Sequence, residues 1–230
     1  LKLSVYSDLG LGDALPGLLR HCEIDTVARW LPFEMAEGDI HDYLSNKALH
    51  PSTLPIEPVE LHLEYALARQ VLRAAIGLAR LSWPEVRGPR GAESMPPLEP
   101  ILASGAALAR CPKPGYTVMV LLDALQPAGV STLVLDPYSL MPAMGAAAGV
   151  LPMASVQVLE SGSFVSLATV VSPVGHGRFG RPVLRLRLER EDGGETVEGE
   201  VRFGQMVVVP LGQGQHARLT LRPERGFDVG

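Results

Sequence analysis

The sequence is poor in the side chains that most often mark a functional site. Only 5% of its 230 residues are aromatic, and only two are cysteine. The scarcity of aromatic residues predicts cores built on leucine, valine, alanine and methionine. Cys22 and Cys111 have no metal-binding spacing. In a chain long enough to form its own core, two reduced thiols are expected in place of a disulfide.

Positive charge and long apolar runs are also lacking. The net charge is −5 and the isoelectric point about 5.7, which argues against a nucleic-acid surface. The longest apolar run, residues 117–125, is interrupted by Asp123 and is too short to span a membrane. No signal peptide is present, so we expect a cytoplasmic protein. The absence of an initial methionine and the abrupt ending at Gly230 predict a fragment of a longer protein.

The motifs of several common active sites are absent as well. The sequence has no GxxxxGK[ST] phosphate loop, no GxGxxG and no GxSxG. Asp39 and Asp42 flank His41, which could indicate an acid–base site. Two acids on a short polar helix are, however, typical of its solvent-exposed face. None of the six histidines forms an HxxxH pair, so we predict no metal site and name no catalytic residue. The histidines are His21, His41, His50, His62, His176 and His216.

The first two thirds of the chain are predicted to be helix-rich α/β. Residues 36–49, 116–125 and 140–149 are predicted helices. The strongest helical period covers residues 59–83, with a buried stripe expected along Leu61, Tyr65, Ala68, Leu72 and Ile76. Short strands are expected at residues 1–6, 101–103 and 130–135. The alternation of strands and helices predicts a partly parallel sheet covered by helices.

From residue 154 onwards the pattern predicts an all-β domain without helices. Asp192-Gly193-Gly194 is a strong hairpin signal, and strands recur about every ten residues, which suits a small barrel or sandwich. We therefore place domains at 1–153 and 154–230, and expect strands 130–135 and 183–188 to lie in different sheets. The predicted strands are 156–158, 164–171, 183–188, 196–203, 206–210 and 217–221.

Basic residues alternate with leucines in one of these strands. Arg185, Arg187 and Arg190 interleave with Leu184, Leu186 and Leu188. A half-exposed strand with solvated arginines explains this pattern. A face for phosphate or an acidic partner is the alternative.

A small-residue turn follows the short strand at residues 101–103. Ser104, Gly105 and Ala106 would let a ligand approach the backbone closely at the start of a helix. Asp136 to Tyr138 follow the other strand, and if the two strands are parallel their ends open on the same side. Packing of small residues at a strand–helix junction is the alternative explanation.

Four segments together resemble a known family. Ser4 to Gly10 looks like the stretch T-V-E-G-D-L-G, and residues 57–80 resemble the long helix that follows it. Ala103-Ser104-Gly105-Ala106 looks like a G-S-G-G adenosine-side motif, with alanines in place of two glycines. Residues 136–145 look like D-x-x-Y-x-x-P-A-M-G with a shorter interval. Over roughly residues 1–150 the chain thus resembles the glutamate-mutase accessory, or MutL-like, proteins, which are unrelated to the mismatch-repair proteins of that name.

The resemblance implies the C-terminal part of an actin-like ATPase fold. It implies ATP or ADP with Mg²⁺ as cofactor of the full-length protein, and a cobalamin-dependent mutase as the partner that is reactivated or assembled. It places nucleotide binding at Ser104, Gly105, Ala106 and Asp136. Both phosphate-binding hairpins of that fold precede Ser4, so this fragment alone is not expected to be an active ATPase. The β domain has no counterpart in the resemblance, and could bind a protein partner.

The sequence therefore leaves three hypotheses for function. The chain is part of an ATP-binding accessory protein, or a protein- or ligand-binding module with a degenerate nucleotide site, or a hydrolase that uses acids such as Asp8, Asp136 or Asp228. A D-[IV]-G-G-x-T-T-D hairpin upstream of Leu1 would favour the first.

Overall fold

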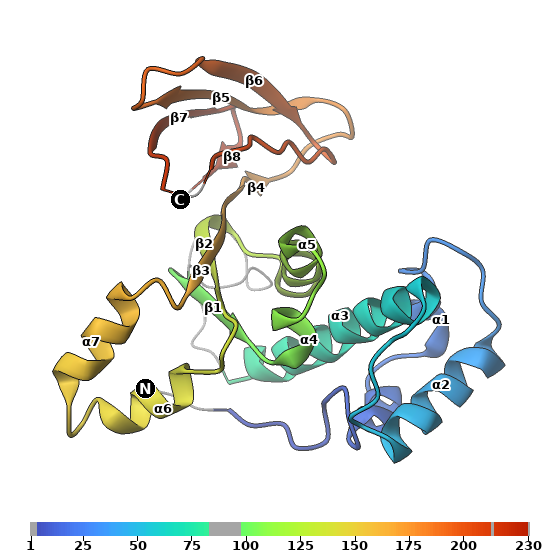
Figure 1. Ribbon diagram of the computed structural model, residues 1–230. Helices are drawn as coiled ribbons and strands as arrows, with labels where there is room; N and C mark the ends of the chain where they lie inside the picture. Colours follow the sequence, from blue (N-terminus) through green and yellow to red (C-terminus); the bar gives the residue numbers. More distant parts are fainter. Residues whose placement is uncertain (1–3, 83–97, 213, 230) are drawn as a thin grey trace. The chain divides into compact units, whose positions relative to one another are not determined.

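A computed structural model describes residues 4–82, 98–212 and 214–229, and shows a mixed α/β chain in which helices dominate first and β-sheets follow (Figure 1). The helices are η1 (Leu15–Arg20), α1 (Ile24–Ala28), α2 (Glu37–Leu49), α3 (Pro58–Arg80), α4 (Ala106–Ala109), α5 (Pro114–Leu125), α6 (Met141–Ala147) and α7 (Pro152–Glu160). The strands are β1 (Ile101–Ser104), β2 (Gly129–Asp136), β3 (Val165–Ser172), β4 (Val174–Gly175), β5 (Pro182–Arg190), β6 (Val197–Arg202), β7 (Ala217–Pro223) and β8 (Phe227–Asp228).

The chain divides into two compact units that do not follow a single cut in the sequence. The first contains the described residues of Leu1–Glu85, Ala103–Gln126 and Leu135–Val165. The second contains those of Val86–Leu102, Pro127–Val134 and Ser166–Gly230. The division predicted between residues 153 and 154 remains a prediction, and α7 runs across that position.

Helix α3 organises the first unit, and it is a single helix as predicted. It ends at Arg80, and residue 83, the predicted end, lies outside the described residues. It begins at Pro58, where a missing N–H costs nothing, and Glu57 and Glu60 form a capping box. Its predicted burial is only partly right. Tyr65 and Ala68 are buried, but Leu61, Leu72 and Ile76 are half-buried.

The buried stripe of α3 differs from the prediction because the helix packs on two sides. One side joins a cluster of fully buried residues from η1, α1 and α2, and the other lies against α5, where Tyr65 stacks on Tyr116. A one-sided periodicity therefore missed four of the six buried residues of α3, Leu63, Ala66, Leu67 and Gln70. The buried cluster consists of Leu15, Leu18, Ile24, Val27, Ile40, Leu44, Leu63, Ala66 and Leu67.

A buried ion pair joins α2 to α3. Lys47 Nζ lies 2.5 Å from Glu64 Oε1 and donates to the backbone oxygen of Thr53. The Tyr43 hydroxyl also donates to Glu64 Oε1, at 3.1 Å. Burial, together with the charge of Glu64, raises the pKa of Tyr43 well above its usual range. The two charged side chains are only 8% and 15% exposed, so each depends on the other for compensation.

Strands β1, β2 and β3 form a sheet in that order, and the predicted strands at 101–103, 130–135 and 164–171 are confirmed. The backbone N–H of Thr132 donates to Glu99, and Ser104 contacts Asp136 at the other end of the strands. The two contacts join residues that are 33 and 32 positions apart in the sequence. Because this separation stays nearly constant along the strands, β1 and β2 run in the same direction. The strand expected at residues 1–6 is not formed by Ser4 to Tyr6, and residues 1–3 lie outside the described part.

The second unit has β5 at the centre of an antiparallel sheet ordered β6-β5-β7. The predicted hairpin is confirmed, with Gly193 at φ 78° and the Asp192 carboxylate accepting from the Gly194 N–H. Strands β5 and β2 lie in different sheets, as expected. The two-residue strands β4 and β8 pair with each other and were too short to show a period.

Two of the β5 arginines, Arg185 and Arg187, are exposed and paired with acids, whereas Arg190 is half-buried and donates to the backbone oxygen of Pro210. Arg185 contacts Glu224 at 3.1 Å, and Arg187 contacts Glu189 and Glu198 at 2.8 and 3.2 Å. These exposed pairs are what a half-exposed strand with solvated arginines predicts.

Three predictions for the second half are wrong. Residues 156–158 belong to α7 rather than a strand, because Pro152 starts a helix and Met, Ala, Gln, Leu and Glu outweigh two valines. Residues 206–210 pair with no strand in the described chain. The sheets of the described residues form no closed barrel, because both β6 and β7 have a free edge and three strands cannot close.

Candidate functional site

The loop after β1 is open and shaped by one glycine. Strand β1 ends at Ser104, and Gly105 has φ 105° and ψ 151°, a conformation that residues with a side chain rarely adopt. A Cβ added to Gly105 would meet nothing within 4 Å, so backbone conformation, not crowding, favours glycine here. Gly105 and Ala106 are both exposed. The backbone of this loop is therefore accessible to a ligand.

Asp136, at the end of β2, is fully buried and bonded to backbone. Its two carboxylate oxygens accept from the N–H groups of Leu140 and Met141, each at 2.9 Å, where α6 begins. Burial raises the pKa of the Asp136 carboxyl, but hydrogen bonds from Met141, Leu140, Tyr138 and Ser104 outweigh burial and hold it below its usual range. Asp136 thus remains ionised and fixes the turn between β2 and α6.

The Ser104 hydroxyl joins the two loops. It donates to the backbone oxygen of Asp136 at 3.3 Å and lies 3.3 Å from the Ser139 hydroxyl. Ser139 has φ 54°, and Tyr138 beside it is 72% exposed. The structure thus brings together all four residues predicted for the site, Ser104, Gly105, Ala106 and Asp136. Sequence reasoning missed Ser139, because serine carries no signal for a left-handed backbone.

The acids proposed for hydrolysis in the first unit, Asp8 and Asp136, both have other partners. Asp8 lies 3.8 Å from both Arg20 and His21, and Asp136 is occupied by backbone N–H groups. Asp228 belongs to strand β8 of the second unit. In the part of the chain that is described, no three His, Cys, Asp or Glu side chains are grouped to hold a metal ion.

The two acids and the histidine considered on the predicted helix 36–49 are exposed on α2. Asp39, His41 and Asp42 lie on the exposed side of α2, as expected for its solvent-facing side.

None of the helices whose residues are described is long and apolar enough to cross a membrane.

These features define a mixed α/β protein with an open strand–loop–helix junction at the carboxyl ends of two parallel strands. Comparison with known families identifies it further. The family model described as "MutL protein" matches residues 1–162. The chain therefore belongs to the MutL family of glutamate-mutase accessory proteins, as the four motifs indicated. No curated protein and no solved structure matches the chain.

The family match sets the two halves of the chain apart. It includes every helix and both strands of the candidate site, and it ends before β3. The sheet β6-β5-β7 lies entirely outside the matched residues. Family membership therefore bears on the Ser104–Ala106 loop and not on this sheet.

Proposed function

We propose that this chain is part of an ATP-binding accessory protein that reactivates or assembles a cobalamin-dependent mutase of the glutamate-mutase type. The family match supports the accessory role, and one structural observation supports nucleotide binding: the exposed backbone of Gly105 and Ala106 follows a strand whose end meets Asp136. Ligands of open α/β sheets bind at such carboxyl ends.

In this proposal the loop contacts the adenosine side of ATP or ADP. The absence of a side chain at Gly105 lets a flat ring lie against the backbone, and exposed Tyr138 forms a nearby wall. Asp136 does not touch the nucleotide; it holds the turn that carries Tyr138 and Ser139. The phosphates and Mg²⁺ would depend on other parts of the full-length protein, because this sequence has no phosphate loop.

A binding module with a degenerate nucleotide site is the second candidate. Ala103 and Ala106 stand where the motif has glycine, and both oxygens of Asp136 face the protein's own backbone. In that case the mutase, or another protein partner bound through the β-sheet unit, would be recognised without nucleotide.

Titration of fluorescently labelled ADP, followed by anisotropy, tests the proposal. Gly105→Val should abolish saturable binding by placing a branched side chain in the loop. Gly162→Val is the matched control, because Gly162 also has a positive φ, 75°, and open space around it. The control variant should bind as the unmodified chain does. If circular dichroism shows that the unmodified chain is folded and it still does not bind labelled ADP, the binding module with a degenerate nucleotide site is favoured.

A further inference from the structure

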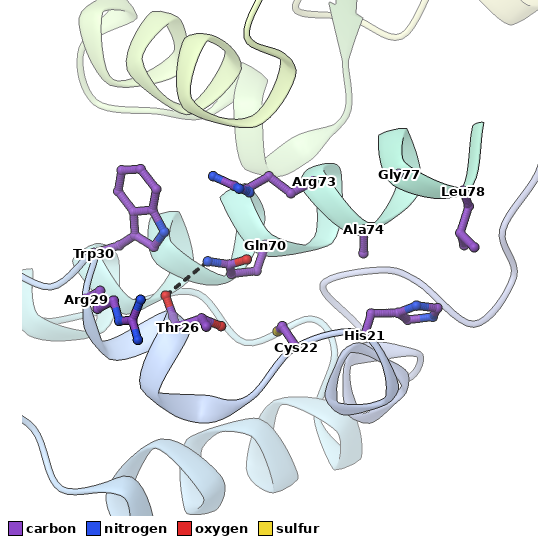
Figure 2. A pocket seen from close by; sticks show the side chains of 10 residues that line it. All are labelled: His21, Cys22, Thr26, Arg29, Trp30, Gln70, Arg73, Ala74, Gly77 and Leu78. Carbon is purple, nitrogen blue, oxygen red and sulfur yellow. Dashed lines mark hydrogen bonds between the residues drawn. The ribbon is translucent and has the colours of Figure 1, made fainter. Parts of the chain in front are cut away.

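A hollow in the first unit shares no residue with the Ser104–Ala106 loop. It has a volume of about 720 Å³ and lies between the segment from η1 to α1 and the C-terminal half of α3 (Figure 2). Small-molecule sites commonly fall between roughly 300 and 1,000 Å³. We call it the α1–α3 groove. Its size is therefore suited to a small organic ligand.

The charged side chains that line the α1–α3 groove are all basic. They are Arg29 and Arg73, with His21 as a third basic group, in a chain whose net charge is −5. Arg29 is 2.8 Å from Asp25 and His21 is 3.8 Å from Asp8, so each of these two has an acidic partner. Arg73 has no ion-pair or hydrogen-bond partner among the described residues, and in Figure 2 its guanidinium points toward the end where Trp30 lies. A guanidinium without a partner is suited to bind a carboxylate or phosphate.

The wall beside Arg73 is aromatic and firmly held. The guanidinium of Arg69 lies 5.2 Å from the centre of the Trp30 ring, and Arg69 Nε is bound to Asp123 at 2.7 Å. Inside the groove, Gln70 donates to the backbone oxygen of Thr26 at 3.0 Å, as Figure 2 shows. These contacts keep the groove in shape without a ligand, which reduces the cost of binding.

The α3 side of the groove is lined by small residues. Ala74 and Gly77 lie one turn apart, and a Cβ at Gly77 would meet nothing within 4 Å. The space is therefore open to a flat group. The Cys22 thiol also lines the groove, and burial raises its pKa, which favours the protonated thiol.

We propose that the α1–α3 groove binds a flat organic anion, with Arg73 holding its carboxylate or phosphate and Trp30 forming a wall for its ring. This site is separate from the proposed nucleotide loop and does not depend on it.

Phenyl phosphate and benzoate are suitable probes, and benzamide is the neutral counterpart of benzoate. Trp30 fluorescence reports binding in a Trp83→Phe background, since the chain has two tryptophans. Phenyl phosphate or benzoate should quench Trp30 saturably. Benzamide should bind at least about tenfold more weakly, because a hydrogen bond to a charged group is lost. Equal binding of benzamide and benzoate would overturn the role of charge.

Two variants locate the site. Arg73→Gln should weaken the binding of both anions at least about tenfold. Its control is Arg80→Gln, which removes the same charge from α3 outside the groove and should leave the affinity for both anions unchanged. Gly77→Leu should block the groove, with Gly38→Leu as its control, because Gly38 is also helical with open space.

The variants must be folded for these comparisons, and helical circular dichroism establishes that. Gly105→Val should not change phenyl phosphate affinity, so failure of the nucleotide proposal and failure of this one are distinguishable. Absence of saturable quenching in the unmodified chain, or full binding by Arg73→Gln, would refute the proposal.

Discussion

The structural role of the Asp136 carboxylate can be tested with Asp136→Asn, which replaces one carboxylate oxygen by an amide NH₂ group. The carboxylate is fully buried and accepts from two backbone N–H groups, those of Leu140 and Met141. An asparagine has one acceptor oxygen, so one of these donors would face an amide NH₂ group instead. A buried donor without a partner costs about 1–3 kcal/mol. We therefore expect Asp136→Asn to lower the free energy of unfolding by about 1–3 kcal/mol at pH 7.

The pH dependence gives this prediction a second, independent readout. The pKa of Asp136 is lower in the folded chain than in the unfolded chain, where it is about 3.9. Its contribution is therefore fully present above pH 4–5 and is lost as the pH falls through the folded pKa. Because asparagine does not titrate, the stability difference between the two proteins should shrink below about pH 4.

Urea unfolding followed by helical circular dichroism at a series of pH values measures both effects. Asp39→Asn makes the same chemical change on the exposed first turn of α2 and should alter stability by less than about 0.5 kcal/mol. Equal stability of Asp136→Asn and the unmodified chain at pH 7, or a difference independent of pH, would refute the role assigned to Asp136.

Three further predictions concern the core and the activity of the chain. Leu67→Ala, at a fully buried position, should cost about 2–5 kcal/mol in urea unfolding, and Leu72→Ala less, since Leu72 is half-buried; an equal cost would contradict the two-sided packing of α3. Lys47→Met should cost about 3–5 kcal/mol by leaving Glu64 buried without its partner, and Lys47→Met with Glu64→Leu should recover most of that loss. A phosphate-release assay should find weak or no ATP hydrolysis by this chain, and robust metal-dependent hydrolysis would show that a phosphate loop is not required.

Sequence periodicity predicted the long elements well and the short ones poorly. Helix α3 was predicted because an amphipathic pattern is sustained over residues 59–83, close to the observed Pro58–Arg80. Helix α7 was missed because Val156 and Val158 alternate with Gln157 as in a strand, and it has no buried residue. Residues 206–210 include three valines and have a high intrinsic strand propensity. A strand also needs a neighbouring strand to pair with, and intrinsic propensity does not show whether one is present.

The sequence predicted which residues lie together at the ends of β1 and β2, but not how Asp136 is bonded. The small residues at Ser104–Ala106 and the acid ending the next strand were visible as a pattern, and parallel strands brought them together. That Asp136 would turn inward to cap α6 depends on backbone direction after Pro137, which composition does not encode. The α1–α3 groove was not predicted, because it joins residues about 45 positions apart, such as Thr26 and Gln70.

The buried pair of Lys47 and Glu64 has a consequence for how α2 and α3 align. Replacement of such a pair by apolar residues is often neutral in stability, so stability alone does not explain its presence. A slip of α2 along α3 by one helical turn, about 5.4 Å, would leave a cation and an anion separated among leucines. Leucine-rich surfaces tolerate many alignments, whereas this pair permits one. We infer that Lys47 and Glu64 favour the one register of α2 against α3 in which their charges meet.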